Sequence, residues 1–225
     1  MSGSAGLRRN SPVLYTVIQW HTVFSVARDC GRCDDDPMTE PITATTEDGR
    51  RYTVREAAPD DEPGVTSLFE ASAEYFEAAT GLPSGPADLQ SLYYSLPPGA
   101  AWQDKRILVV TEDTDGPVVG LVDAVLHHPD PDACAVGLFL LHPSLWGTGA
   151  ARPLATVLLN HAAASGTARV TATVPTDWDR GRRFLAALSF RFTGPAPQGP
   201  TTANRSTGPR EPVVERAELV LPRTA

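Results

Sequence analysis

Hydrophobic and polar positions from residue 50 onward follow the periods of strands and helices in turn. A first strand is predicted at residues 52–54, where tyrosine, threonine and valine alternate in polarity. A helix follows, because four apolar residues fall on one face at helical spacing: Val65, Leu68, Phe69 and Phe76. Residues 81–86 interrupt this pattern, and a second helix at 87–96 ends before two prolines and a glycine.

The remainder of the chain is predicted to contain six more strands and two more helices. The strands are expected at residues 106–111, 118–127, 135–141, 168–174, 190–193 and 213–221. One helix follows Pro143 and carries Leu154, Val157 and Leu158 on one face, and the other spans residues 178–189. The predicted order is therefore β-α-α-β-β-β-α-β-α-β-β.

Residues 1–49 lack the pattern of a folded domain, so we predict a disordered N-terminal extension followed by one domain at residues 50–222. The apolar patch at residues 13–27 is broken by polar residues and is too short to span a bilayer. A signal peptide remains an alternative for this patch. Another alternative is that translation begins at Met38, which would leave the extension without a folded role.

Composition narrows the classes of partner. The 225 residues carry a formal net charge of −8, which argues against nucleic acid or an anionic membrane surface. Cys30 and Cys33 have the spacing of half a zinc site, but the only other cysteine, Cys134, lies in a predicted buried strand. We therefore expect no metal site, three reduced thiols and a cytoplasmic protein.

The strand at residues 135–141 and the helix after it enclose a short glycine-containing loop. Gly147 and Gly149 permit positive φ angles and a close backbone approach. The amides from Thr148 to Ala151 precede the first helical hydrogen bonds and lie at the positive end of the helix dipole. Such a loop suits a phosphate or pyrophosphate group.

Three alternatives follow from the loop itself. A Walker phosphate loop needs Gly-Lys followed by Ser or Thr, whereas Ala-Arg-Pro follows the second glycine here. A dinucleotide-binding loop needs a small residue where Arg152 stands, and an acidic residue about 20 positions later. A plain strand-to-helix turn without a ligand remains the third alternative.

The segment His142-Pro-Ser-Leu-Trp-Gly-Thr-Gly-Ala-Ala-Arg-Pro-Leu154 resembles the acyl-CoA binding motif of the GNAT superfamily of N-acetyltransferases. The family motif, Gln/Arg-x-x-Gly-x-Gly/Ala, is matched at Gly149 and Ala151. Its first position falls on Trp146, which removes a cationic or amide side chain. In the family the segment binds the pyrophosphate of acetyl-CoA through backbone amides.

Residues 178–190 resemble a second feature of the family. With this feature the resemblance covers residues 50–221. Phe190 fits the family pattern. Trp178 stands where the family has Asn, Leu185 where it has Tyr and Ser189 where it has Gly. That tyrosine commonly protonates the departing CoA sulfur in the family, and Leu185 cannot do so.

The resemblance implies an α/β fold with a mixed, mostly antiparallel sheet of about seven strands and helices on both faces. It implies transfer of an acetyl group from acetyl-CoA, as cosubstrate, to an amine; a catalytically inactive CoA-binding module is the alternative. The central strand should diverge from the next at Pro143, and an amide near residues 139–141 should stabilise the oxyanion. The implied cofactor-binding residues are Leu140, Leu141, Trp146, Gly147, Thr148, Gly149, Ala150, Ala151, Arg152, Trp178 and Phe184.

Two residues are candidate catalytic groups. Asp123 lies in an otherwise apolar strand, where burial would raise its pKa toward the range of a general base; a satisfied or outward-facing carboxylate is the alternative. Tyr94 is the candidate acid if one is needed; the alternative is an enzyme that relies on its base and oxyanion donor alone, because a CoA thiolate is a tolerable leaving group near neutral pH. The acceptor pocket is expected to be lined by the first two helices through Glu74, Tyr75, Glu77, Tyr93 and Tyr94, which suits a small cationic amine; an exposed acidic helix face is the alternative for the two glutamates. We expect a monomer or homodimer.

Overall fold

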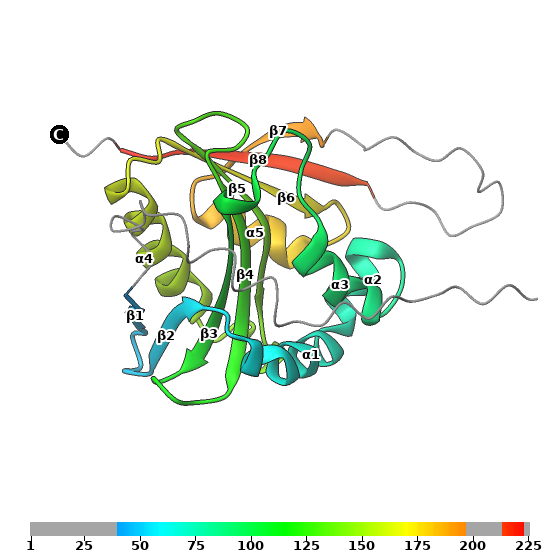
Figure 1. Ribbon diagram of the computed structural model, residues 1–225, viewed down its shortest axis with the longest axis vertical. Coiled ribbons are helices and arrows are strands. Elements are labelled where there is room, and N and C mark those ends of the chain that lie inside the picture. Colours follow the sequence, from blue (N-terminus) through cyan, green and yellow to red (C-terminus); the bar gives the residue numbers. More distant parts are fainter. Residues whose placement is uncertain (1–39, 197–212, 223–225) are drawn as a thin grey trace, which may run out of the picture. The chain divides into compact units, whose positions relative to one another are not determined.

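The computed structural model describes residues 40–196 and 213–222 (Figure 1). The chain divides into two units at Asp36 and Pro37, and the described residues all belong to the second unit. The apolar patch at 13–27, the cysteines at 30 and 33, and residues 197–212 lie outside the described part. No helix within the described ranges combines the length and apolarity that crossing a membrane requires.

Within residues 40–196 and 213–222, eight strands form one sheet in the order β1-β2-β3-β4-β5-β6-β8-β7. Their bounds are β1 Ile42–Thr45, β2 Arg51–Glu56, β3 Lys105–Glu112, β4 Val118–Leu126, β5 Ala133–Leu141, β6 Arg169–Pro175, β7 Arg191–Pro195 and β8 Val214–Val220. Every neighbouring pair is antiparallel except β5 and β6, which run parallel. The predicted mixed, mostly antiparallel α/β fold is confirmed.

In the part of the chain that the structure describes, five α-helices pack against this sheet. They are α1 Glu62–Ala71, α2 Ala73–Thr80, α3 Pro86–Tyr94, α4 Ala151–Ala164 and α5 Asp179–Ala187. Figure 1 shows α1 to α3 on one side of the central strands and α4 on the other. The side chains agree, because Val65 and Leu92 share a buried cluster with Leu121 of β4, whereas Leu154 shares another with Val122.

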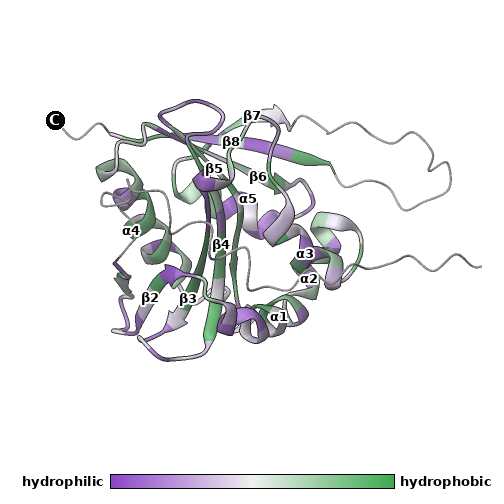
Figure 2. Ribbon diagram, viewed as in Figure 1, coloured by the Kyte–Doolittle hydropathy of each residue, from purple (hydrophilic) through white to green (hydrophobic). Residues whose placement is uncertain are grey.

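Long apolar stretches along the central strands account for this two-sided packing. Figure 2 shows these strands as mostly hydrophobic, whereas the helices mix hydrophobic and hydrophilic residues. A strand with apolar side chains on both faces must be covered on both faces, while a helix needs only one apolar stripe. The central strands β4 and β5 are accordingly covered on both faces.

Two features of the fold differ from the sequence-based expectation. The boundary at Gly49 is wrong by one strand, because β1 pairs with β2 from Ile42 opposite Val54 to Thr45 opposite Arg51. Ala44 of β1 is 1% exposed and belongs to the cluster beneath α4. The first predicted helix is also two helices, since the backbone leaves helical geometry at Ser72, between α1 and α2.

Candidate functional site

Strands β5 and β6 pair along only part of their lengths. Ala133 to Val136 of β5 lie opposite Arg169 to Ala172 of β6, after which the pairing ends although both strands continue. On its other edge β5 stays paired with β4 as far as Leu141. The divergence was expected at Pro143, and that position is wrong. It begins after Val136, inside the strand.

A bulge at Gly137 marks the point of divergence. Asp123 of β4 lies opposite Leu138, but the next residue of β4 lies opposite Val136, so Gly137 is an extra residue in β5. One extra residue moves the following side chains to the opposite faces of the sheet. Val136 packs in the clusters on the α4 side and Leu138 in the cluster of α1 to α3. Gly137 itself is exposed in mid-strand.

Backbone amides of β5 beyond the bulge face the open edge. The amide of His142 donates to the carbonyl of Val119 in β4, at 2.8 Å. Because successive amides of a strand point in opposite directions, those of Leu141 and Phe139 point away from β4. The Leu141 carbonyl also faces that way, since the indole N–H of Trp146 donates to it at 2.7 Å. The amides of Phe139 and Leu141 are therefore candidates for the oxyanion donor expected near residues 139–141, whereas the amide of Leu140 faces β4.

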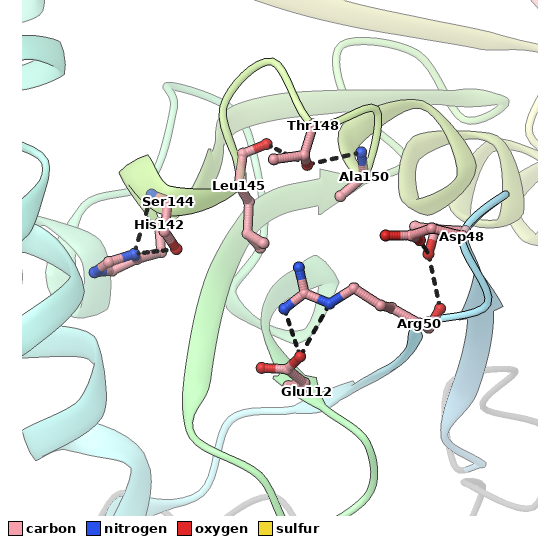
Figure 3. A network of polar contacts seen from close by, with 9 residues as sticks. Asp48, Arg50, Glu112, His142, Ser144, Leu145, Thr148 and Ala150 are labelled. Carbon is pink, nitrogen blue, oxygen red and sulfur yellow. Dashed lines mark hydrogen bonds and ion pairs between the residues drawn. The ribbon is translucent and has the colours of Figure 1, made fainter.

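The glycine turn, residues 147–149, connects the end of β5 to α4 (Figure 3). Gly147 and Gly149 have φ angles of 77° and 92°, which favour glycine. The Thr148 hydroxyl donates to the carbonyl of Leu145 at 2.8 Å and accepts from the amide of Ala150 at 3.4 Å. These local bonds shape the turn from within.

Several amides at this helix start have no internal partner. Within the described ranges, no group accepts a hydrogen bond from the amides of Gly149, Ala151 or Arg152. No acidic residue lies in the first turn of α4, and the side chain of Arg152 is exposed. Unsatisfied amides at a helix N-terminus attract anions, so this turn presents amide donors to an anion.

Aromatic side chains bridge the divergent strands. Phe139 of β5 stacks on Phe184 of α5, with ring centroids 5.4 Å apart. Trp146 meets Trp178 edge to face at 5.5 Å, and Trp178 meets Tyr75 of α2 at 5.9 Å. Trp178 and Phe184 are thus brought to the open edge with Trp146. Tyr75 packs beside them, and burial raises its pKa to about 12.

Asp123 lies beside the bulge on the α1 to α3 face. A Cβ atom at Gly137 would be 3.5 Å from its Oδ2. The ammonium of Lys105 donates to Asp123 Oδ2 at 3.1 Å, lies 2.9 Å from Oδ1, and also donates to the carbonyl of Ser95 at 3.0 Å. Burial raises the pKa of Asp123, and the opposite charge of Lys105 limits that rise.

Sequence reasoning did not identify Lys105 or Gly137 as site residues, although each carries a signal. Lys105 is the only lysine among 19 basic Lys and Arg residues, and its side chain is 7% exposed. Gly137 is an isolated glycine inside an apolar strand, which is typical of a bulge. Neither signal by itself shows that the residue lies beside Asp123.

Other expected site residues lie apart from this group. Tyr94 is 49% exposed at the end of α3, and Glu74 and Glu77 are exposed on α2. Leu140 is buried in the cluster of α1 to α3. Leu185, which has no hydroxyl group, packs against the cluster that contains Phe190.

Comparison with known proteins identifies the family to which this architecture belongs. A family model described as the acetyltransferase (GNAT) domain matches residues 51–191. Among curated proteins, none matches the sequence significantly.

Solved structures share the fold at low sequence identity. An acetyltransferase from Thermus thermophilus is 22% identical with a TM-score of 0.56, over 80% of this chain and 100% of its own. The spermidine N-acetyltransferase of Vibrio cholerae, in complex with CoA and spermine, is 16% identical with a TM-score of 0.54, over 75% and 95%. The ribosomal-protein-S18-alanine N-acetyltransferase of Escherichia coli is 14% identical with a TM-score of 0.54, over 77% and 96%.

Proposed function

The chain belongs to the GNAT family of acetyltransferases, and from that premise we propose that it transfers an acetyl group from acetyl-CoA to the amine of a small acceptor. The observation that carries the proposal is the divergence of β5 from β6 after Val136, next to the glycine turn. The two features together supply an open strand edge and an anion-binding helix start. We further propose a cytoplasmic monomer or homodimer.

Acetyl-CoA is proposed to bind with its pyrophosphate at the glycine turn and its thioester at the bulge. The amides of Gly149, Ala151 and Arg152, which have no acceptor among the described residues, would donate hydrogen bonds to phosphate oxygens. The pantetheine arm would follow the edge of β5, where the amides of Phe139 and Leu141 face outward. One of these amides would donate to the thioester carbonyl oxygen and stabilise the oxyanion that forms on attack.

The proposed chemistry is direct attack without an acyl-enzyme. The neutral amine nitrogen of the acceptor attacks the thioester carbon, the carbon–sulfur bond then breaks, and CoA leaves as a thiolate. The proton lost by the attacking nitrogen passes to the carboxylate of Asp123, directly or through water. Lys105 favours the charged form of Asp123, which is the form able to accept that proton.

The acceptor is proposed to approach from the face of α1 to α3, because the side chain of Asp123 lies on that face. Asp123 is half-buried beside the exposed Gly137, so an amine at the bulge would lie near both the carboxylate and the strand edge. A carboxylate at this point also suits a cationic acceptor. The solved Vibrio cholerae neighbour holds spermine, which makes polyamines a natural first probe.

Thiol release tests the proposed transfer. The full chain is incubated with acetyl-CoA and a panel of amines that includes spermine, short diamines and peptide N-termini, and free CoA is measured. We expect at least one amine to release CoA faster than water does, with the acetylated amine found by mass spectrometry. No release with any amine would contradict the proposed activity.

One observation favours a second candidate function, a CoA-binding module without catalysis. Leucine has no ionisable group, so the family's usual source of an acid is absent at position 185. The side chain of Leu185 instead packs against the hydrophobic cluster that contains Phe190. A thermal shift with CoA, combined with no turnover across the amine panel, would support this module over the enzyme.

A further inference from the structure

The stretch that would hold the pyrophosphate contains no cationic side chain of its own between the end of β5 and the start of α4. Residues 142–151 include one histidine, His142, and its Nδ1 accepts a hydrogen bond from the amide of Ser144. Arg152 is the first arginine after the turn. A pyrophosphate at this turn would therefore meet backbone amides but no cationic side chain from residues 142–151. A cation from another element would increase the affinity for CoA.

Trp146 provides a fixed platform immediately before the turn. Its indole N–H donates to the Leu141 carbonyl at 2.7 Å, and its ring meets that of Trp178 edge to face. Trp178 in turn lies against Gly181, where a Cβ atom would be 2.4 Å from the indole Cδ1. Gly181 thus gives Trp178 the room to support Trp146.

Arg180 of α5 lies over this platform. Its guanidinium carbon is 5.1 Å from the centroid of the Trp146 ring, within the range of a cation–π interaction. Arg180 is exposed, and among the described residues it forms no ion pair. Arg182, two residues further on, is instead paired with Glu215 at 3.0 Å. A guanidinium that stacks by its face keeps its N–H donors free in the plane.

We propose that Arg180, held in place by Trp146, is the cation that receives a phosphate group of acyl-CoA at the glycine turn. The inference rests on the proposed function, because it assumes that CoA binds there. Arg180 would be a binding residue and Trp146 a positioning residue. A planar guanidinium suits two oxygens of one phosphate, and the interaction with tryptophan limits the side-chain freedom that binding would otherwise remove.

Calorimetric titration of the full chain with CoA tests the role of Arg180. We expect Arg180→Gln to weaken the Kd about tenfold, as the loss of a charge-assisted hydrogen bond predicts. The matched control is Arg183→Gln, which removes the same charge from the next turn of α5 and should change the Kd less than about twofold. Equal Kd values for the two variants would overturn the proposal.

Pantetheine, which lacks the phosphates, separates charge recognition from general damage. Its Kd should be the same for the original chain and Arg180→Gln, whereas an equal loss for pantetheine and CoA would overturn the proposal. A chain that fails to bind CoA even without substitution would overturn both this inference and the proposed function. Binding of CoA with no effect of Arg180→Gln would overturn this inference alone.

A double-mutant cycle tests the role of Trp146. Trp146→Leu should weaken CoA binding, and Arg180→Gln should cost less than about threefold in that background because the cation is no longer positioned. Trp146→Phe, which keeps an aromatic face, should retain most of the effect of Arg180. Strictly additive losses would show that Arg180 acts without the tryptophan, and circular dichroism would confirm that each variant is folded.

Discussion

The two halves of β5 share one neighbour and differ in the other. From Cys134 to Val136 the strand is paired on both edges, and beyond the bulge at Gly137 it is paired with β4 alone. The first half has its backbone groups committed to the sheet. The second half presents amides to an open edge beside a carboxylate and a helix start. The proposed site lies where the pairing with β6 stops, and the paired half holds β5 in the sheet.

The turns at the two ends of α4 give the largest expected effect. Gly149→Asp, at the end of the open half, should weaken CoA binding about a hundredfold or more, because it adds a negative charge where phosphate must approach. Its control is Gly166→Asp, at the other end of α4 and just before β6. Both glycines have positive φ angles, 92° and 91°, and neither would place a Cβ within 4 Å of other atoms.

The backbone strain of the two variants should therefore be similar, and their melting temperatures should fall by similar amounts. CoA titration then isolates the effect of position. Equal CoA affinity in the two variants would show that the glycine turn does not bind the pyrophosphate.

The carboxylate beside the open half should have the next largest effect. Asp123→Asn is expected to lower kcat/KM about a hundredfold, as the loss of a general base predicts. The control is Thr171→Val in β6, because Thr171 is buried opposite Ala135 of the paired half and the change keeps the side-chain shape. That variant should keep kcat/KM within about threefold. Steady-state kinetics on folded protein distinguishes them, and full activity of Asp123→Asn would assign the base elsewhere.

The pH dependence of kcat/KM tests how Lys105 acts on Asp123. Because its charge limits the rise in the pKa of Asp123, Lys105→Met should raise that pKa and move the acidic limb of kcat/KM about one unit toward higher pH. Lys105→Arg keeps the charge and should leave the limb nearer its original position. A pH–rate profile of each variant gives the measurement. An unmoved limb for Lys105→Met would separate Asp123 from the proton transfer.

The free energy of unfolding of Lys105→Met should also depend on pH. A carboxyl group whose folded-state pKa lies above its unfolded value stabilises the fold at low pH, and the contribution is lost as pH rises through the folded pKa. Lys105→Met should raise the folded pKa of Asp123 further. Its deficit in the free energy of unfolding should therefore be largest near neutral pH and shrink on acidification.

Local signals predicted the fold and the turn better than the rest of the site. Strands and helices were found from periodicity within each segment, and the glycine turn from adjacent residues. The ion pair of Lys105 and Asp123 joins β3 to β4, and the stack of Arg180 on Trp146 joins α5 to the loop after β5. Such contacts depend on how elements are placed in space, which a pattern along one segment does not contain. β1 was missed because polar residues surround its four-residue alternation.

The smallest expected effect concerns the start of the folded domain. A chain that begins at Met38 should keep its melting temperature within about 1 °C, because it retains β1, whose Ala44 is buried against the cluster that includes Leu154 of α4. A chain that begins at Gly49 removes β1 and leaves the edge of β2 unpaired. Losing that burial should cost about 2 kcal/mol, which corresponds to a fall of about 4–8 °C for a domain of this size. Thermal unfolding followed by circular dichroism compares the two truncations with the full chain. A fall of several degrees already at Met38 would show that residues 1–37 stabilise the domain, and the N-terminal extension would then have a folded role.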